Sequence, residues 1–110
     1  MQTKVSLTPE MRARFYHGLA EPARLAILDA LRDGELGVTE VANEAGLSLS
    51  NASRHLACLR DCGLIEARLD WRHVYYRLAD GIEDLLTDHE PLIERIAARL
   101  GNCDLLEEAH

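Results

Sequence analysis

Residues 39–62 read TEVANEAGLSLSNASRHLACLRDC, a stretch in which Gly46-Leu47-Ser48 separates two helical patterns. Glycine ends a helix readily because it adopts the left-handed conformation of a helix terminus, and the Ser48 hydroxyl can accept a backbone N–H at the start of the next helix. A second glycine, Gly63, ends the helix that begins near Leu49. The stretch therefore predicts a short helix, a tight turn and a longer helix, which is the layout of a helix-turn-helix.

The chain on either side of this stretch predicts further helices and a hairpin. Helical spacing of apolar residues predicts one helix over about residues 9–20 and another over about 22–32, with Pro22 suited to its first turn. Residues 64–69 and 73–78 are short runs rich in β-branched, leucine and tyrosine side chains, which predict a β-hairpin. The expected fold class is mainly α with a small β-hairpin, in the order of a winged helix-turn-helix, whose second paired helix enters the DNA major groove.

A last helix is predicted over residues 82–100, where apolar residues recur at helical spacing. Pro91 lies inside it and is expected to kink or split it, because proline lacks the N–H that a helix interior requires. The helices over 9–20 and 82–100 carry apolar stripes larger than one small winged helix covers, so we expect them to form a homodimer interface. Residues 101–110 follow as a short tail.

Size and composition point to one soluble domain. The chain has 110 residues, 47% of them hydrophobic and 28% charged, and we place a single domain over residues 1–110. No apolar run reaches the ~18 residues of a membrane span, and the N-terminus lacks the layout of a secretory signal, so we expect a cytoplasmic protein with no membrane partner. The net charge of −7 argues against nucleic acid, but residues 48–77 carry five basic and three acidic side chains. The positive charge thus coincides with the predicted second helix and hairpin.

The predicted helix from Leu49 has two different faces. At about 100° per residue, its apolar positions share an arc that we expect to face the core: Leu49, Ala52, Leu56 and Leu59. Polar side chains on the other arc can hydrogen-bond base edges, and serines near the helix start can contact phosphates. Basic hairpin residues are candidates for contact with phosphates or with the minor groove. The candidate contacts to operator DNA are Ser48, Ser50, Asn51, Ser53, Arg54 and His55 in the helix and Arg68, Arg72 and His73 in the hairpin.

Three cysteines indicate a second kind of site. Cys58 and Cys62 are four positions apart, so they lie one turn apart on one helix face, beside the arc expected to read DNA. Two thiols at this spacing can chelate a soft cation, but two ligands make a poor site, and Cys103 in the tail is the candidate third ligand. In a reducing compartment these cysteines are expected to be free thiols, available to a metal or an oxidant.

A series of short motifs resembles the ArsR/SmtB family of bacterial repressors over about residues 10–100. The motifs are LAEPARLAIL at 19–28, VA at 41–42, GLS at 46–48, SRHL at 53–56, LR at 59–60, GLI at 63–65 and RHVYYRL at 72–78. The resemblance implies a homodimeric winged helix-turn-helix repressor that holds operator DNA until an effector, usually a metal ion, releases it. Relatives often have glycine where this chain has Trp71, so the turn type and the DNA contact of the wing tip do not carry over from the family.

The run Cys58-Leu59-Arg60-Asp61-Cys62-Gly63-Leu64, together with Cys103, is similar to the cadmium- and lead-sensing branch of that family. The similarity implies Cd(II) or Pb(II) as the inducer, with Zn(II) or As(III) as alternatives, and a tail thiolate supplied by the other protomer. An arsenite- or thiol-redox-responsive repressor would use the same cysteines, and a metal-buffering or interaction module with a vestigial wing is the alternative from another class. An enzyme is not expected, because the sequence has no phosphate loop, no cysteine with an evident histidine base and no carboxylate pair at a meaningful spacing.

Overall fold

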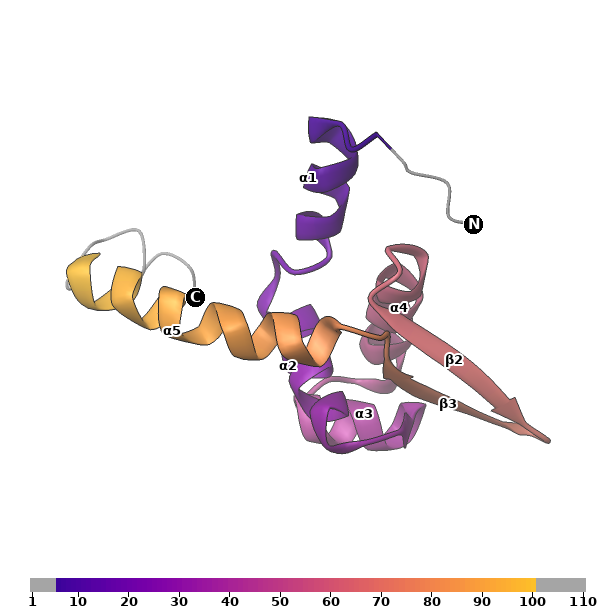
Figure 1. Cartoon of the computed structure of the whole chain (residues 1–110). Helices are drawn as coiled ribbons and strands as arrows, with labels where there is room; N and C mark the ends of the chain where they lie inside the picture. Colours follow the sequence, from indigo (N-terminus) through magenta and orange to yellow (C-terminus); the bar gives the residue numbers. More distant parts are fainter. Residues whose placement is uncertain (1–5, 101–110) are drawn as a thin grey trace. The chain divides into compact units, whose positions relative to one another are not determined.

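The computed structural model describes residues 6–100, and within them the predicted order of helices and strands is confirmed (Figure 1). The chain divides between Ala79 and Asp80 into two compact units, which are described separately. The first unit contains α1 (Pro9–His17), α2 (Pro22–Ala30), the 3-10 helix η1 (Leu31–Asp33), β1 (Leu36–Gly37), α3 (Val38–Ala45), α4 (Leu49–Asp61), β2 (Ile65–Asp70) and β3 (His73–Leu78). The second unit contains α5 (Ile82–Leu100).

The turn between α3 and α4 lies where the sequence predicts it. Gly46 has a φ of 71° at the end of α3, the left-handed region in which a residue without Cβ is least strained. Two residues later, the Ser48 hydroxyl accepts a hydrogen bond from the backbone N–H of Asn51 at 3.2 Å and caps α4. The turn between α3 and α4 is therefore fixed by one conformational preference and one side-chain hydrogen bond.

The core of the first unit joins α2, α3, α4 and the residues that lead into β2. Its largest fully buried side chains are Ile27, Leu28, Val41, Leu56, Leu59 and Leu64. Burial of aliphatic side chains of this size contributes about 1.5–3 kcal/mol each. The two helices of the helix-turn-helix therefore pack against α2, and the opposite face of α4 is exposed to solvent.

Three antiparallel strands in the order β1-β3-β2 form the wing (Figure 1). The pairing of Asp70 with His73 leaves Trp71-Arg72 as a two-residue turn at the tip, one residue shorter than the predicted connection Asp70-Trp71-Arg72. Strand β1 is not predicted, because two residues are too few to carry an alternating pattern. It pairs Leu36 with Tyr76 and so ties the wing to the segment that precedes α3.

The second unit corrects one expectation. Helix α5 continues without a break from Ile82 to Leu100 with Pro91 inside it, so the expected split is wrong. Proline removes one main-chain hydrogen bond, but the remaining bonds of a 19-residue helix are enough to carry the helix past it. Among the helices described within residues 6–100, none has the length and apolarity needed to cross a membrane.

Candidate nucleic-acid interface and thiol pair

The exposed side of α4 carries five of the six helix residues predicted to contact DNA. Ser48, Ser50, Asn51, Ser53 and Arg54 are all exposed. The guanidinium of Arg54 donates from Nη2 to Oδ1 of Asn51 at 3.1 Å, so the two side chains lie together on the helix surface. Arginine and asparagine both offer paired hydrogen-bonding groups that match guanine and adenine edges in the major groove. This face can therefore read bases with one adjoining pair of side chains.

His55 is placed differently from the prediction. It is only 8% exposed, and its Nε2 lies 3.3 Å from Oε1 of Glu21, at the N-terminus of α2. His55 adjoins Leu56 and stands three positions after Ala52, so the boundary of the buried arc falls one position further round the helix than expected. The prediction that His55 belongs to the DNA-facing surface is wrong in this structure. Leu49, predicted to face the core, is 53% exposed at the first position of α4.

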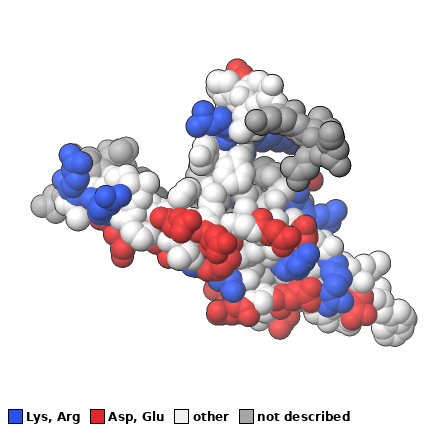
Figure 2. All heavy atoms as spheres, viewed as in Figure 1, with Lys and Arg blue, Asp and Glu red and all other residues white. Residues whose placement is uncertain are grey.

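Arg68 in β2 has protein partners of its own. Its Nε and Nη2 donate to the two carboxylate oxygens of Glu35 at 3.0 and 2.7 Å, and its Nη1 lies 3.6 Å from Asp70. The hydrogen bonds from Arg68 hold the pKa of the Glu35 carboxyl below its usual range, and the same contact raises the pKa of Arg68. Figure 2 shows acidic and basic groups mixed over this part of the surface. A DNA phosphate would have to compete with Glu35 for Arg68.

The wing tip and the reading helix share one hollow in the surface. A cleft of about 380 Å³ is lined by Ser53 from α4, by Arg72, His73, Val74, Tyr75 and Tyr76 from the wing, and by Gly37, Val38, Thr39 and Glu40 at the start of α3. Arg72 and His73 are exposed. Three of the predicted DNA contacts, Ser53, Arg72 and His73, therefore belong to one continuous concave surface.

Trp71 stands at the tip of the wing with unusual backbone geometry. Its φ is 60°, in the left-handed region that a bulky side chain rarely adopts, and its side chain is 79% exposed. The guanidinium of Arg72 lies over the Trp71 ring, 4.7 Å from its centre. This cation–π contact offsets part of the backbone strain.

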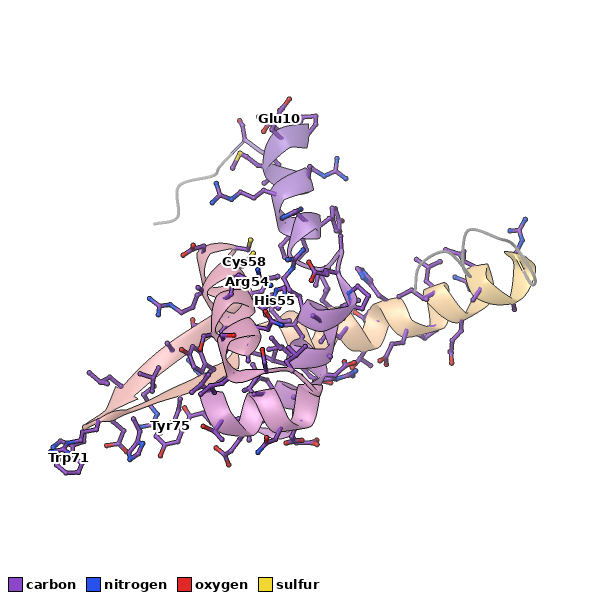
Figure 3. All side chains as sticks on the ribbon, turned by 180° about the vertical axis from the view of Figure 1, so that it is seen from behind. Glu10, Arg54, His55, Cys58, Trp71 and Tyr75 are labelled. Carbon is purple, nitrogen blue, oxygen red and sulfur yellow. The ribbon has the colours of Figure 1, made fainter. Side chains whose placement is uncertain are left out.

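Cys58 and Cys62 form a half-buried pair of free thiols at the C-terminal end of α4. Burial raises the pKa of the Cys62 thiol, and the charge and hydrogen bond of neighbouring Cys58 raise it further, against an opposing effect of Arg14 and Arg24. Cys58 lies on the same helix as Arg54 and His55 (Figure 3). Two adjacent sulfurs suit soft cations such as Cd(II), Pb(II) and Hg(II), which bind thiolates more readily than oxygen donors.

A complete metal site needs a ligand beyond this pair. Within residues 6–100, no group of three or more His, Cys, Asp or Glu side chains is placed to hold a metal ion. The predicted third ligand, Cys103, lies outside the described residues. The thiols of Cys58 and Cys62 can therefore supply part of a soft-metal site, which requires a donor from elsewhere in the chain or from a second chain.

Sequence reasoning missed a buried cluster where α1 gives way to α2. Arg24 is 7% exposed and donates to the main-chain oxygens of His17 and Gly18 at 2.9 and 3.1 Å, and to Oε2 of Glu21 at 3.0 Å. The other carboxylate oxygen of Glu21 faces His55. An arginine that adjoins the apolar side of α2 was the available signal, since a buried arginine needs partners.

Comparison with known proteins gives consistent matches. A family model described as bacterial regulatory protein, arsR family, matches residues 21–67. The HTH-type transcriptional regulator CmtR of Mycobacterium tuberculosis is 49% identical over 78 residues, which cover 67% of this chain and 66% of CmtR, just under two thirds of that protein. A probable mercury resistance operon repressor of Streptomyces lividans is 38% identical over 96 residues, which cover 86% of this chain and 77% of the repressor.

Solved structures share the fold. A homodimeric winged helix-turn-helix DNA-binding domain from Mycobacterium bovis superposes with a TM-score of 0.68 at 31% identity, covering 86% of this chain and 91% of that chain. The cadmium metal-sensor CmtR of Mycobacterium tuberculosis, solved by NMR, superposes with a TM-score of 0.64 at 41% identity, covering 74% of this chain and 85% of that chain. The winged helix-turn-helix predicted from the sequence is thereby confirmed.

Proposed function

The chain belongs to the ArsR family of bacterial regulatory proteins, and from that premise we propose that it is a homodimeric repressor released from operator DNA by Cd(II) or Pb(II). Its relatives and its fold are those of DNA-binding transcriptional regulators and not of enzymes. As such a regulator it would act in the cytoplasm, where its operator lies.

One observation carries the proposal. A single helix, α4, presents Asn51 and Arg54 on its exposed face and the thiols of Cys58 and Cys62 at its C-terminal end. A ligand of the thiols therefore binds the same rigid element that meets the DNA. Regulation requires that the free energy of DNA binding differ between the metal-free and the metal-bound protein, and this difference is the coupling free energy.

DNA recognition is assigned to the face of α4 and to the wing. Asn51 and Arg54 would contact base edges, while the serines at the start of α4 would contact phosphates. Arg72 and His73, which share a cleft with Ser53, would contact the backbone beside the major groove. The net charge of −7 does not oppose this, because the contacts come from residues 48–77, where basic side chains exceed acidic ones.

A second copy of the chain is expected to cover α1. None of the residues of this helix is buried, and its exposed apolar side chains include Met11 at 46% and Tyr16 at 50%. A hollow of about 300 Å³ lies against them, lined by Leu7, Met11, Arg12, Phe15 and Tyr16. A two-fold dimer would bury this surface and match a palindromic operator.

The inducer would bind through thiolates of Cys58, Cys62 and Cys103. Each sulfur gives up its proton to solvent as its bond to the metal forms, so binding requires no oxidant or reductant. Two observations favour Cd(II): the similar CmtR structure is that of a cadmium metal-sensor, and this chain carries the Cys58 to Leu64 motif. The Streptomyces lividans relative is named for mercury resistance, which makes Hg(II) a second candidate.

Operator binding of the reduced full-length protein tests the proposal. Anisotropy of labelled DNA from upstream of its own gene would be followed while Cd(II), Pb(II), Hg(II), Zn(II) or As(III) is added. We expect tight binding by the metal-free dimer and release by Cd(II) and Pb(II) at lower concentrations than by Zn(II). Release by As(III) or by a mild oxidant alone would replace the cadmium assignment with the arsenite or redox alternative, and no operator binding in any state would refute the repressor.

A further inference from the structure

The segment between α1 and α2 touches the reading helix at two separate places. At its beginning, Gly18 lies against the C-terminal end of α4: a Cβ on Gly18 would stand 3.5 Å from Cβ of Cys62 and 2.5 Å from Cδ1 of Leu64. At its end, Glu21 faces His55, about two turns earlier in the same helix. Residues 17–24, here called the junction, therefore contact both the thiol pair and the middle of the DNA-reading helix.

Arg24 holds the junction in one shape. Its guanidinium donates three hydrogen bonds within the junction: to His17 O at 2.9 Å, to Gly18 O at 3.1 Å and to Oε2 of Glu21 at 3.0 Å. Arg24 is only 7% exposed, its bond to Gly18 is buried, and its charge is paired with the partly exposed carboxylate of Glu21. The carboxylate of Glu21 is thus shared between Arg24 on one side and His55 on the other.

A metal bound at the thiol pair would act next to this junction. Gly18 packs directly against Cys62 and Leu64, so closely that a Cβ on Gly18 would clash with Leu64, and a shift of the Cys62 side chain therefore bears on the main chain at Gly18. The carbonyl of Gly18 accepts a hydrogen bond from Arg24, which also donates to Glu21. A chain of contacts therefore connects Cys62 with Gly18, Arg24, Glu21 and His55.

We propose that the junction is the coupling element of this repressor: a metal bound at the thiol pair displaces Gly18, weakens the hydrogen bonds of Arg24 to Gly18 and Glu21, and so loosens the Glu21 contact that positions His55 and the reading helix. The inference rests on the proposed function, and it assigns Glu21, Arg24 and His55 as positioning residues that touch neither metal nor DNA. Gly18 contributes by its lack of a side chain, which lets the junction pack directly against Leu64 and Cys62.

The test is a double-mutant cycle on the contact between Glu21 and His55. Glu21→Gln, His55→Gln and the double variant are compared with the wild type for three quantities: operator affinity without metal, operator affinity with saturating Cd(II), and cadmium bound per dimer. Asp29→Asn is the matched control, because it removes an ion pair with Arg32 from the same helix without touching the junction. Thermal unfolding of each variant reports whether it is folded.

We expect every variant to bind as much cadmium as the wild type. The ratio of the two operator affinities should fall from about 100-fold in the wild type to below about 10-fold in each single variant, and no further in the double variant, because all three lose the same contact. Asp29→Asn should keep the full ratio.

The inference would be overturned if either single variant kept the wild-type ratio, or if the effects of the two substitutions multiplied in the double variant. Should Glu21→Gln prove unfolded, His55→Gln decides by the same ratio. A wild-type protein that failed to bind operator or cadmium would refute the proposed function itself, which is a separate outcome from a responsive wild type with fully responsive variants.

Discussion

The guanidinium of Arg68 donates two hydrogen bonds to the carboxylate of Glu35, at 3.0 Å from Nε and 2.7 Å from Nη2, across 33 positions of sequence. This pairing connects β2 of the wing to the segment between η1 and β1. Because β1 also pairs with β3, both a main-chain ladder and this ion pair connect the β2–β3 hairpin to the segment that precedes α3.

Glu35→Gln should remove the acid sensitivity that this pair contributes. The pKa of Glu35 is lowered in the folded state, so its contribution to stability is present above the ordinary glutamate pKa of about 4.3 and is lost as pH falls through the lowered value. Urea unfolding of wild type and Glu35→Gln between neutral and acid pH should therefore give curves that converge in acid. A difference that grew with falling pH would contradict the ion pair.

Trp71→Asn should stabilise the fold. Trp71 has a φ of 60°, where asparagine is far better tolerated, and relief of roughly 1–2 kcal/mol of strain exceeds the loss of an exposed cation–π contact of about 0.5–1 kcal/mol. Chemical denaturation should show a gain of about 0.5–1 kcal/mol in the free energy of unfolding. Trp71→Val, a β-branched residue at the same φ, is the control and should be less stable than the wild type; equal or lower stability of Trp71→Asn would count against strain at the tip.

The sequence predicts those parts of the molecule that depend on local chemistry. Gly46 and Ser48 define the turn of the helix-turn-helix because a left-handed glycine and a hydroxyl cap act over a few residues. The thiol pair of Cys58 and Cys62 was found because helical spacing alone brings the two residues together.

Features that depend on packing between distant segments were missed or mistaken. A helical wheel places His55 on the outer face of α4, because the wheel contains no information on how far the N-terminus of α2 extends around α4. The bonds of Arg24 and the pairing of Arg68 with Glu35 join residues whose proximity no local pattern reports. Cys103 lies outside residues 6–100, so its predicted role as third ligand stays a prediction.

Arg54→Ala should weaken operator binding by about 1–3 kcal/mol and relax sequence specificity, because Arg54 is exposed beside Asn51 on the face of α4.

Arg72→Ala should weaken binding to all sequences alike and reduce the slope of log affinity against log salt by about one. Arg60→Ala removes another exposed arginine, from the last turn of α4, and should change operator affinity little. Anisotropy at several salt concentrations measures all three, and operator affinity unchanged by Arg54→Ala would refute the assignment of the reading face.

The affinity for cadmium should increase with pH, and it should keep increasing up to a higher pH than for an ordinary pair of thiols. Burial and Cys58 raise the pKa of Cys62, so its proton remains to be displaced above the usual thiol pKa of about 8.5. The raised pKa also means that folded-state protonation of Cys62 contributes stability below the ordinary thiol pKa, and that this contribution is lost as pH rises through the raised value. Chelator competition at several pH values should show the affinity for cadmium still rising above pH ~8.5.

Cys58→Ser tests the coupling of the two thiols. In this variant the ultraviolet thiolate absorbance of Cys62 should appear at lower pH than in the wild type, because Cys58 raises the pKa of Cys62. An unchanged titration would contradict the coupling.

The third ligand can be located by counting cadmium in a mixed dimer. One chain carries Cys58→Ser and Cys62→Ser and keeps its tail, and the other carries Cys103→Ser and keeps its thiol pair. If the tail thiolate crosses the dimer, the intact pair of the second chain meets the intact tail of the first, and the purified heterodimer should bind one cadmium tightly with three thiolate charge-transfer contributions. A tail that folds back onto its own chain leaves this heterodimer with no three-sulfur site. Each homodimer of the two variants lacks a complete site in either arrangement, so both serve as controls, and one tight cadmium against none distinguishes a shared site from a site within one chain.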